Sequence, residues 1–161
     1  MATAYADDLL IAVSIAEVEN CTNIEMTKIK RWSKENKLQF NYQKSHVMLI
    51  SRRRKDRKSI DIYLNNGRLE QVNKMKYLGI IIDSKFTFNE HIKYATDRCI
   101  KLINALSKSA RISWGLRPEA LKIIYNGAVF PKLLYAAPLW IESMKRKYNR
   151  AKYIRVQDSL T

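Results

Sequence analysis

The sequence predicts an α+β fold in which short antiparallel hairpins pack on a helix and are followed by a mostly helical lobe. Of its 161 residues 47% are apolar, and only 4 Gly and 3 Pro interrupt them, which excludes a disordered or linker-dominated chain. Short apolar runs with turn signals fill residues 1–84, whereas helical periodicity dominates residues 85–161. We therefore expect two regions with these bounds.

The first region is expected to begin with a hairpin and a helix. Two short apolar strands within residues 3–13 flank the pair Asp7-Asp8. A helix is expected over residues 14–36, because its first residue and Glu17 form a capping-box pattern. One face of this helix is expected to hold Val18, Cys21, either Ile24 or Glu25, Ile29 and Trp32.

The rest of the first region reads as alternating strands and loops. The pattern predicts a connector over 38–44, a strand over 46–50 and a basic loop over 51–58. A hairpin over 60–72 and a buried strand over 76–83 are expected to follow. The hairpin is indicated by Asn65-Asn66-Gly67, since Asn-Gly is a strong turn signal between two apolar runs.

The second region is expected to be helical. Asn89 can cap a helix that runs to about residue 110, with apolar side chains at helical spacing. Pro118 suits the first turn of a further helix. Pro131 and Pro138 are expected to break the following segment into pieces that end in a basic tail.

The basic charge of the chain is concentrated in one part of it. The formal net charge is +15, yet the first fifty residues hold six Lys/Arg and six Asp/Glu, so residues 51–161 carry 24 basic and 9 acidic side chains. Such asymmetry favours a polyanionic partner such as nucleic acid, or an anionic membrane surface. The densest runs, 52–58 and 145–155, could each also be solvated surface or a nuclear address.

The number of cysteines and the hydropathy of the chain indicate its cellular compartment. Cys21 and Cys99 are too few for a disulfide framework and are expected to be reduced and packed in helices. No apolar run reaches the roughly 18–20 residues of a membrane span. Asp7 and Asp8 precede the apolar run near the N-terminus, where a signal peptide would carry basic residues. We expect an intracellular protein of the nucleus or cytoplasm that is neither secreted nor membrane-bound.

The most informative chemistry lies in Tyr5-Ala6-Asp7-Asp8, which has apolar, strand-like residues on both sides. Neighbouring carboxylates on a tight turn repel each other, and a divalent cation is the usual group that offsets this repulsion. Mg²⁺ commonly takes one or two carboxylates together with water and substrate phosphates. Two such ions stabilise the attacking and leaving oxygens of phosphoryl transfer. The alternative is a solvated turn in which aspartate is simply a good turn former.

Five segments in order resemble the reverse transcriptases of non-LTR retrotransposons, in particular arthropod jockey-type elements. The Tyr-Ala-Asp-Asp segment looks like motif C, and residues 38–45 resemble motif D with Lys44 at its lysine. Lys76-Tyr77-Leu78-Gly79-Ile80 is similar to motif E, the primer grip. Residues 86–92 and 125–140 resemble the entry and the body of the thumb.

The resemblance implies a palm segment over residues 1–84 and a thumb-like region with a basic tail over 85–161. In this family the first metal-binding aspartate (motif A), the fingers and other template-binding segments lie upstream of motif C, whereas this chain begins four residues before Tyr5. The chain is therefore expected to be the C-terminal palm and thumb of a longer polymerase, inactive alone. The implied partners are an RNA template, a DNA primer, dNTPs and the upstream segments, with Mg²⁺ as cofactor.

The resemblance also implies roles for individual residues near the chemistry. Asp7 and Asp8 would bind metal, and Lys44 would protonate or neutralise the leaving pyrophosphate, unless it is one more surface lysine. Tyr5 and Ala6 would lie against the primer terminus, although Tyr5 could instead pack on the sheet.

The remaining implied contacts are to the nucleic-acid backbone. Tyr77, Leu78 and Gly79 would grip the primer, with core packing as the alternative for Leu78. On one face of the helix over 89–110 and just beyond it lie four basic residues that could follow duplex phosphates: Lys93, Lys101, Lys108 and Arg111. The large aromatic residues Tyr125, Tyr135 and Trp140 are expected to be core side chains.

Two further functional classes stay open at this point. One is a non-catalytic nucleic-acid-binding remnant of a retroelement, which the +15 charge supports and which would bind in a salt-dependent manner. The other is a product that does not fold stably, because a palm cut between strands would expose unpaired edges.

Overall fold

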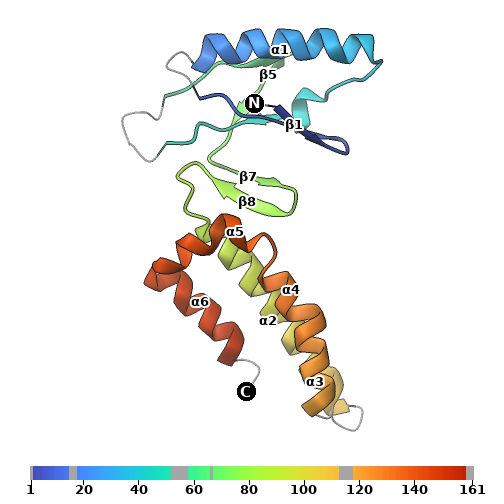
Figure 1. Cartoon of the computed structure of the whole chain (residues 1–161), viewed down its shortest axis with the longest axis vertical. Coiled ribbons are helices and arrows are strands. Elements are labelled where there is room, and N and C mark those ends of the chain that lie inside the picture. The colour runs from blue at the N-terminus through green and yellow to red at the C-terminus, as the bar shows by residue number, and fades with distance from the viewer. Residues whose placement is uncertain (1, 15–17, 52–57, 66, 113–117, 159–161) are drawn as a thin grey trace. The chain divides into compact units, whose positions relative to one another are not determined.

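The computed structural model describes residues 2–14, 18–51, 58–65, 67–112 and 118–158 (Figure 1). Both helices and small sheets are present, which confirms the α+β class. The chain divides into two compact units, Met1–Asn73 and Lys74–Thr161. The two compact units meet after residue 73, whereas the two functional regions were expected to meet after residue 84. The boundary between the functional regions stays a prediction.

The first unit combines one long helix with short strands. Its elements are β1 Ala2–Tyr5, β2 Asp8–Ile11, α1 Val18–Glu35, η1 Tyr42–Lys44, β3 His46–Val47, β4 Tyr63–Leu64, β5 Gly67–Arg68 and β6 Glu70–Gln71. The pairs β1–β2 and β4–β5 are antiparallel, as expected. The strand predicted over 46–50 is only two residues long, and it pairs with β6 in parallel.

The core of the first unit lies between α1 and the segment that includes β4. Its buried side chains are Met26, Ile60, Ile62, Leu64 and Leu69. The Asn23 side chain fixes α1 to this segment, because its amide donates to the Asp61 carbonyl (3.0 Å) and its oxygen accepts from the Tyr63 amide (3.3 Å). The helix therefore buries the face that holds Asn23, Met26 and Ser33.

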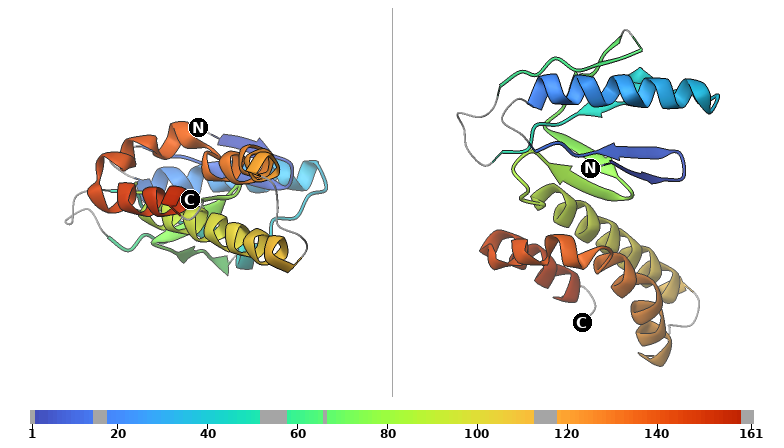
Figure 2. Two further views of the ribbon diagram at one scale, coloured as in Figure 1. Left: turned by 90° about the horizontal axis from the view of Figure 1, so that it is seen from below. Right: turned by 45° about the horizontal axis from the view of Figure 1, so that its top comes forward.

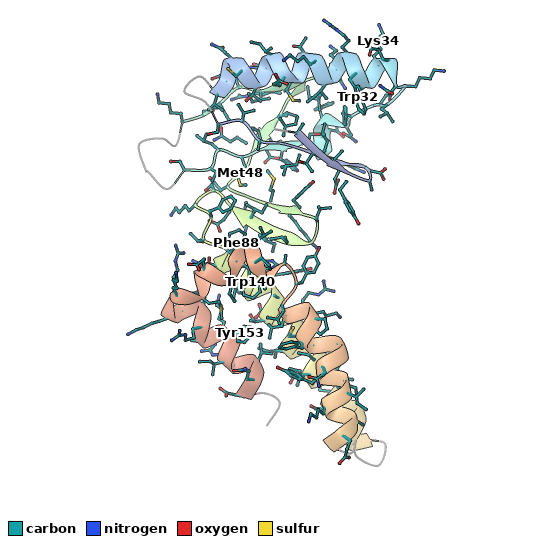
Figure 3. The ribbon with its side chains drawn as sticks, in the orientation of Figure 1. Trp32, Lys34, Met48, Phe88, Trp140 and Tyr153 are labelled. Atoms are coloured by element: carbon teal, nitrogen blue, oxygen red, sulfur yellow. The ribbon has the colours of Figure 1, made fainter. Side chains whose placement is uncertain are left out.

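The buried face of α1 was predicted correctly only in part, since Val18, Cys21 and Ile29 are half-buried and Ile29 packs against the core. Ile24 and Trp32 are 58% and 50% exposed, and Trp32 is labelled in Figure 3, whereas the buried positions are Met26 and Ser33. The buried Ser33 hydroxyl is satisfied within the helix, because it donates to the Lys30 carbonyl (3.0 Å). The capping box expected at the helix start includes Glu17, which lies outside the described residues.

Gly67 is not part of the turn that the Asn-Gly signal predicted. It is the first residue of β5 and is paired with Leu64, so the turn begins at Asn65, which has a φ of 49°. A Cβ on Gly67 would lie 2.6 Å from Cδ2 of the Tyr42 ring. This position thus needs glycine because an aromatic ring packs directly on its backbone.

The second unit is a hairpin followed by helices. Its elements are β7 Lys74–Tyr77, β8 Ile80–Asp83, α2 Asn89–Ile112, α3 Pro118–Ile124, η3 Tyr125–Val129, α4 Phe130–Leu133, α5 Ala137–Trp140, η4 Ile141–Lys145 and α6 Lys147–Asp158. The single strand expected over 76–83 is wrong: the chain reverses at Leu78 and Gly79, whose φ values are 44° and 82°. β7 and β8 then pair in antiparallel fashion.

Asp83 organises the start of α2. Its Oδ2 accepts hydrogen bonds from the amides of Phe88 (2.7 Å) and Thr87 (2.9 Å). Asn89, the expected cap, instead accepts at Oδ1 from the amide of Asn149 in α6 (2.9 Å). The Asp83 carboxylate thus fixes the turn that leads from β8 into α2, while the side chain of Asn89 joins α2 to α6.

The helices of the second unit enclose two buried clusters. One contains Cys99, Ile103, Val129, Leu133 and Val156. Val156 belongs to α6, so the expected basic tail is a helix packed against α2. The other contains Ile80, Phe88, Ile92 and Trp140; Figure 3 labels Phe88 and Trp140 there.

The segment after α2 bends without a break at Pro131. Tyr125–Val129 is a π-helix that leads directly into α4, so the helical backbone continues through Pro131, although the proline nitrogen cannot donate a hydrogen bond. The reversal comes later, at Ala136, which has a φ of 52°, and Pro138 lies in the first turn of α5. Figure 2 shows α3 and α4 running beside α2.

Candidate metal and nucleic-acid site

The acidic pair lies at the tip of the β1–β2 hairpin. Tyr5 pairs with Asp8, so Ala6 and Asp7 form the two-residue turn, which the right-hand view of Figure 2 shows in blue. Ala6 has a φ of 49°, a left-handed conformation that is uncommon for residues other than glycine. Tyr5, Asp7 and Asp8 are all exposed, so Tyr5 does not pack on the sheet.

The tip offers ligands of the type that Mg²⁺ requires, but too few for a complete site. Asp7 and Asp8 provide carboxylate oxygens, which are hard ligands suited to this ion. Within the described residues no group of three or more His, Cys, Asp or Glu side chains could hold a metal. The two aspartates are therefore suited to be part of the ligand set of such an ion, and their binding of metal stays a prediction.

Lys44 ends the short helix η1 and is exposed. The helix is capped by Asn41, whose side chain accepts from the Gln43 amide at 2.9 Å. This arrangement presents the ammonium group to solvent, and its expected action on the leaving group stays a prediction.

The β7–β8 turn is held in place by Tyr135, which lies just after α4. The Tyr135 hydroxyl donates to the Leu78 carbonyl (2.9 Å), and the Tyr135 carbonyl accepts from Nε1 of buried Trp140 (2.8 Å). Tyr135 was expected in the core but is 52% exposed, because it covers this turn. Tyr77 and Leu78 are half-buried, while Gly79 is exposed.

We expect Gly79→Ala to destabilise the second unit by about 1–2 kcal/mol, the cost of a left-handed backbone for a residue with a Cβ. The added Cβ would also lie 3.3 Å from Cε1 of Tyr135. Urea unfolding measures the difference. Gly127→Ala is the matched control, because nothing lies within 4 Å of its Cβ position in the π-helix, and a variant of Gly79 as stable as this control would contradict the account.

The basic residues expected along α2 share an exposed face. Lys93, Lys101 and Lys108 are exposed, as are Asp97 and Asn104 between them. Arg111 belongs to the last turn of α2, but its side chain lies outside the described part. The three lysines thus form a cationic stripe, which we call the α2 stripe.

His91 is a titratable group that the sequence left unassigned. It is 3% exposed, and its Nδ1 accepts from the Ile81 amide at 3.4 Å, which ties α2 to β8. Its ring lies 6.1 Å from that of Trp140. Burial lowers the pKa of His91 below 6.5, because the charged imidazolium would lose its hydration.

The lowered pKa of His91 predicts that acid destabilises the second unit. The unfolded chain binds this proton more tightly, so stability is complete above pH 6.5 and falls as the pH decreases from there through the folded-state pKa. Chemical unfolding between pH 8 and pH 5 measures it. His91→Asn keeps an acceptor but does not titrate, so it should remove this part of the pH dependence; an unchanged dependence would refute the assignment.

The acidic hairpin and the cationic helix are features of proteins that handle nucleic acids with metal ions. Residues 1–82 match the family described as "Reverse transcriptase (RNA-dependent DNA polymerase)". This match covers half of the chain, so the chain belongs to the reverse transcriptase family.

The relatives of the chain come from non-LTR retrotransposons of arthropods. It is 27% identical over 157 residues to a "Retrovirus-related Pol polyprotein from type-1 retrotransposable element R1 2" of Nasonia vitripennis, covering 91% of this chain and 38% of the relative. It is 29% identical over 147 residues to a "Putative 115 kDa protein in type-1 retrotransposable element R1DM" of Drosophila melanogaster, covering 89% of this chain and 14% of the relative. It is 28% identical over 158 residues to a "Probable RNA-directed DNA polymerase from transposon BS" of the same fly, covering 94% of this chain and 17% of the relative.

These matches confirm the family resemblance, including its extension beyond residue 82 into the helical region. The chain spans less than two fifths of the length of each of these relatives. No solved structure matches it. Among the described helices, none combines the length and apolarity that a membrane crossing requires.

Proposed function

We propose that the chain supplies the acidic hairpin and a nucleic-acid-binding helix of an RNA-directed DNA polymerase. Such an enzyme adds dNTPs to a primer 3′-hydroxyl on an RNA template. The observation that carries the proposal is the exposed Asp7–Asp8 tip between paired strands, within the segment that matches the reverse transcriptase family.

Each site residue has a role in this proposal. Asp7 and Asp8 would hold Mg²⁺, which when bound supplies the positive charge that stabilises phosphoryl transfer. Tyr5 and Ala6 would contact the primer end, and Lys44 would donate a proton to the leaving pyrophosphate. Since the described residues lack a third metal-binding group beside the pair, we expect no primer extension by purified 1–161 alone, with upstream segments of a parent polypeptide as the partner.

The nucleic-acid contacts of the proposal lie in the second unit. The Tyr77–Leu78–Gly79 segment would contact the primer backbone through the turn that Tyr135 holds. The α2 stripe, continued by Arg111, would follow the phosphates of the template–primer duplex, because exposed lysines along one helix face can each contact a phosphate.

The binding part of the proposal predicts a specific salt dependence. The logarithm of the affinity for an RNA–DNA hybrid falls linearly with the logarithm of the salt concentration. Replacing Lys93, Lys101 and Lys108 with glutamine should make this slope less steep by about 0.9 for each lost phosphate contact. Fluorescence anisotropy measures this slope. As a control of equal charge we choose three exposed lysines of the first unit: Lys30, Lys34 and Lys37. Equal slopes for the two triple variants would contradict a specific role for the stripe.

A further inference from the structure

The proposed function leaves the basic run at residues 145–155 without a role. This run is folded, because it forms the end of η4 and most of α6. The inner side of α6 is held by Val156, which is buried in the cluster with residues of α2 and α4. The amide of buried Asn149 also donates to Asn89 Oδ1 (2.9 Å) and to the Ser143 carbonyl (3.0 Å). These contacts fix the rotation of α6 about its axis and so determine which of its side chains face solvent.

The solvent side of α6 carries an apolar strip. Ala151 and Ile154 are three residues apart, which places them on one helix face, and both are exposed. Tyr148 lies one turn before Ala151 and is 62% exposed. Nζ of Lys152 lies 4.0 Å from the centroid of the Tyr148 ring, so this cation already contacts an aromatic face. We call Tyr148, Ala151 and Ile154 the outer α6 face. Its apolar and aromatic character is typical of the centre of a protein–protein contact.

Cationic side chains flank the outer α6 face. Lys147 lies in the first turn of the helix, and Arg150 and Arg155 lie on opposite sides of Ile154 around it. All three cations are exposed. Among the described residues, Lys147 and Arg150 belong to none of the ion pairs. The sequence of α6 has four basic residues but a single acidic one, Asp158 at its end, so this surface favours an anionic partner.

The mixture of apolar and cationic residues discriminates between partners. Nucleic-acid phosphates pair with cations but leave the apolar strip exposed to water. A second copy of this chain would bring the same cations to the contact, and like charges across an interface are unfavourable. An amphipathic helix with carboxylates beside an apolar stripe matches both parts, in the way that charged residues flank the apolar seam between two paired helices.

We propose that the outer α6 face binds an acidic amphipathic helix of a partner protein. An apolar side chain of the partner lies against Ala151 and Ile154, and carboxylates of the partner pair with Lys147 and Arg150. The small side chain of Ala151 allows the two helices to approach closely. The surface lies outside the acidic hairpin, the β7–β8 turn and the α2 stripe. The proposal therefore adds a protein contact to the proposed function and does not depend on it.

The test is binding of a fluorescent synthetic peptide to the 161-residue chain, measured by anisotropy. The peptide has about 20 residues, long enough to form a helix, with leucine on one face and glutamate elsewhere. Ile154→Gln should weaken its binding about tenfold, as expected for the centre of a contact. Ile123→Gln is the matched control, because Ile123 is 71% exposed in α3, and it should bind like the unchanged chain. Both positions are exposed, so both variants should fold.

A second pair of variants tests the role of charge. Arg150→Gln should weaken binding of the peptide about threefold, the effect of losing an exposed ion pair. Lys101→Gln, an exposed change in the α2 stripe, should leave the affinity unchanged. A peptide in which lysine replaces glutamate should not bind. Binding of that peptide, or no binding of the glutamate peptide, would overturn the proposal.

Three further outcomes would also overturn it. Equal losses in Ile154→Gln and Ile123→Gln would show that the peptide is attracted to the chain without a defined site. A concentration-dependent dimer in sedimentation that Ile154→Gln abolishes would make a second copy the occupant. An RNA–DNA hybrid that displaces the peptide, and whose affinity falls in Arg150→Gln but not in Ile154→Gln, would make nucleic acid the occupant.

Discussion

Trp140→Ala is expected to lower the free energy of unfolding of the second unit by about 3–5 kcal/mol, the usual cost of removing a buried tryptophan. Trp140 is 2% exposed and packs with Ile80, Phe88 and Ile92. Its indole nitrogen also donates to the Tyr135 carbonyl (2.8 Å), so the variant loses a hydrogen bond together with the apolar contacts. Denaturant unfolding monitored by circular dichroism gives the change.

Leu139→Ala is the control for this prediction, because Leu139 is the adjacent residue of α5 but is 59% exposed. Its stability should change by no more than about 0.5 kcal/mol. Trp140→Phe should fall between the two, since it retains a ring but not the donor. If Trp140→Ala and Leu139→Ala unfolded at the same denaturant concentration, the cluster around Trp140 would not be a core of the second unit.

The elements predicted best from sequence are those with a long or strongly patterned signal. The helix over 89–110 is present as Asn89–Ile112, because its apolar residues recur with helical period over six turns. The hairpin around Asp7 is also present, since polar residues interrupt two apolar runs at its tip. Lys93, Lys101 and Lys108 are exposed on α2, and their binding role stays a prediction.

The errors come from contacts that are distant in sequence. The run of isoleucines at 80–82 suggested one continuous strand, but the left-handed backbone at Leu78 and Gly79 turns it into a hairpin. Tyr135, 57 residues away from Leu78, supports that turn, and no local pattern could show this pairing. The basic tail likewise reads as polar, yet Val156 within it is fully buried.

Asp7→Asn is expected to have the largest effect on chemistry. It keeps the size of the side chain but removes the negative charge of the carboxylate that is proposed to bind metal. A polymerase that depends on this carboxylate should therefore lose at least about a hundredfold in rate, which corresponds to about 2.7 kcal/mol. The variant should fold normally, because Asp7 is an exposed turn residue. Glu35→Gln, which neutralises an exposed carboxylate at the end of α1, is the control and should retain full activity.

The most direct measurement is primer extension by a chimera in which residues 1–161 replace the matching segment of the Nasonia R1 2 polyprotein, 38% of its length. The assay supplies an RNA template, a DNA primer, dNTPs and Mg²⁺. The account predicts extension by the chimera and by its Glu35→Gln variant, with loss of extension in Asp7→Asn. Full extension by Asp7→Asn would contradict it, and a chimera that binds the hybrid without extending it, while the parent polyprotein does extend, would instead favour a non-catalytic nucleic-acid-binding remnant.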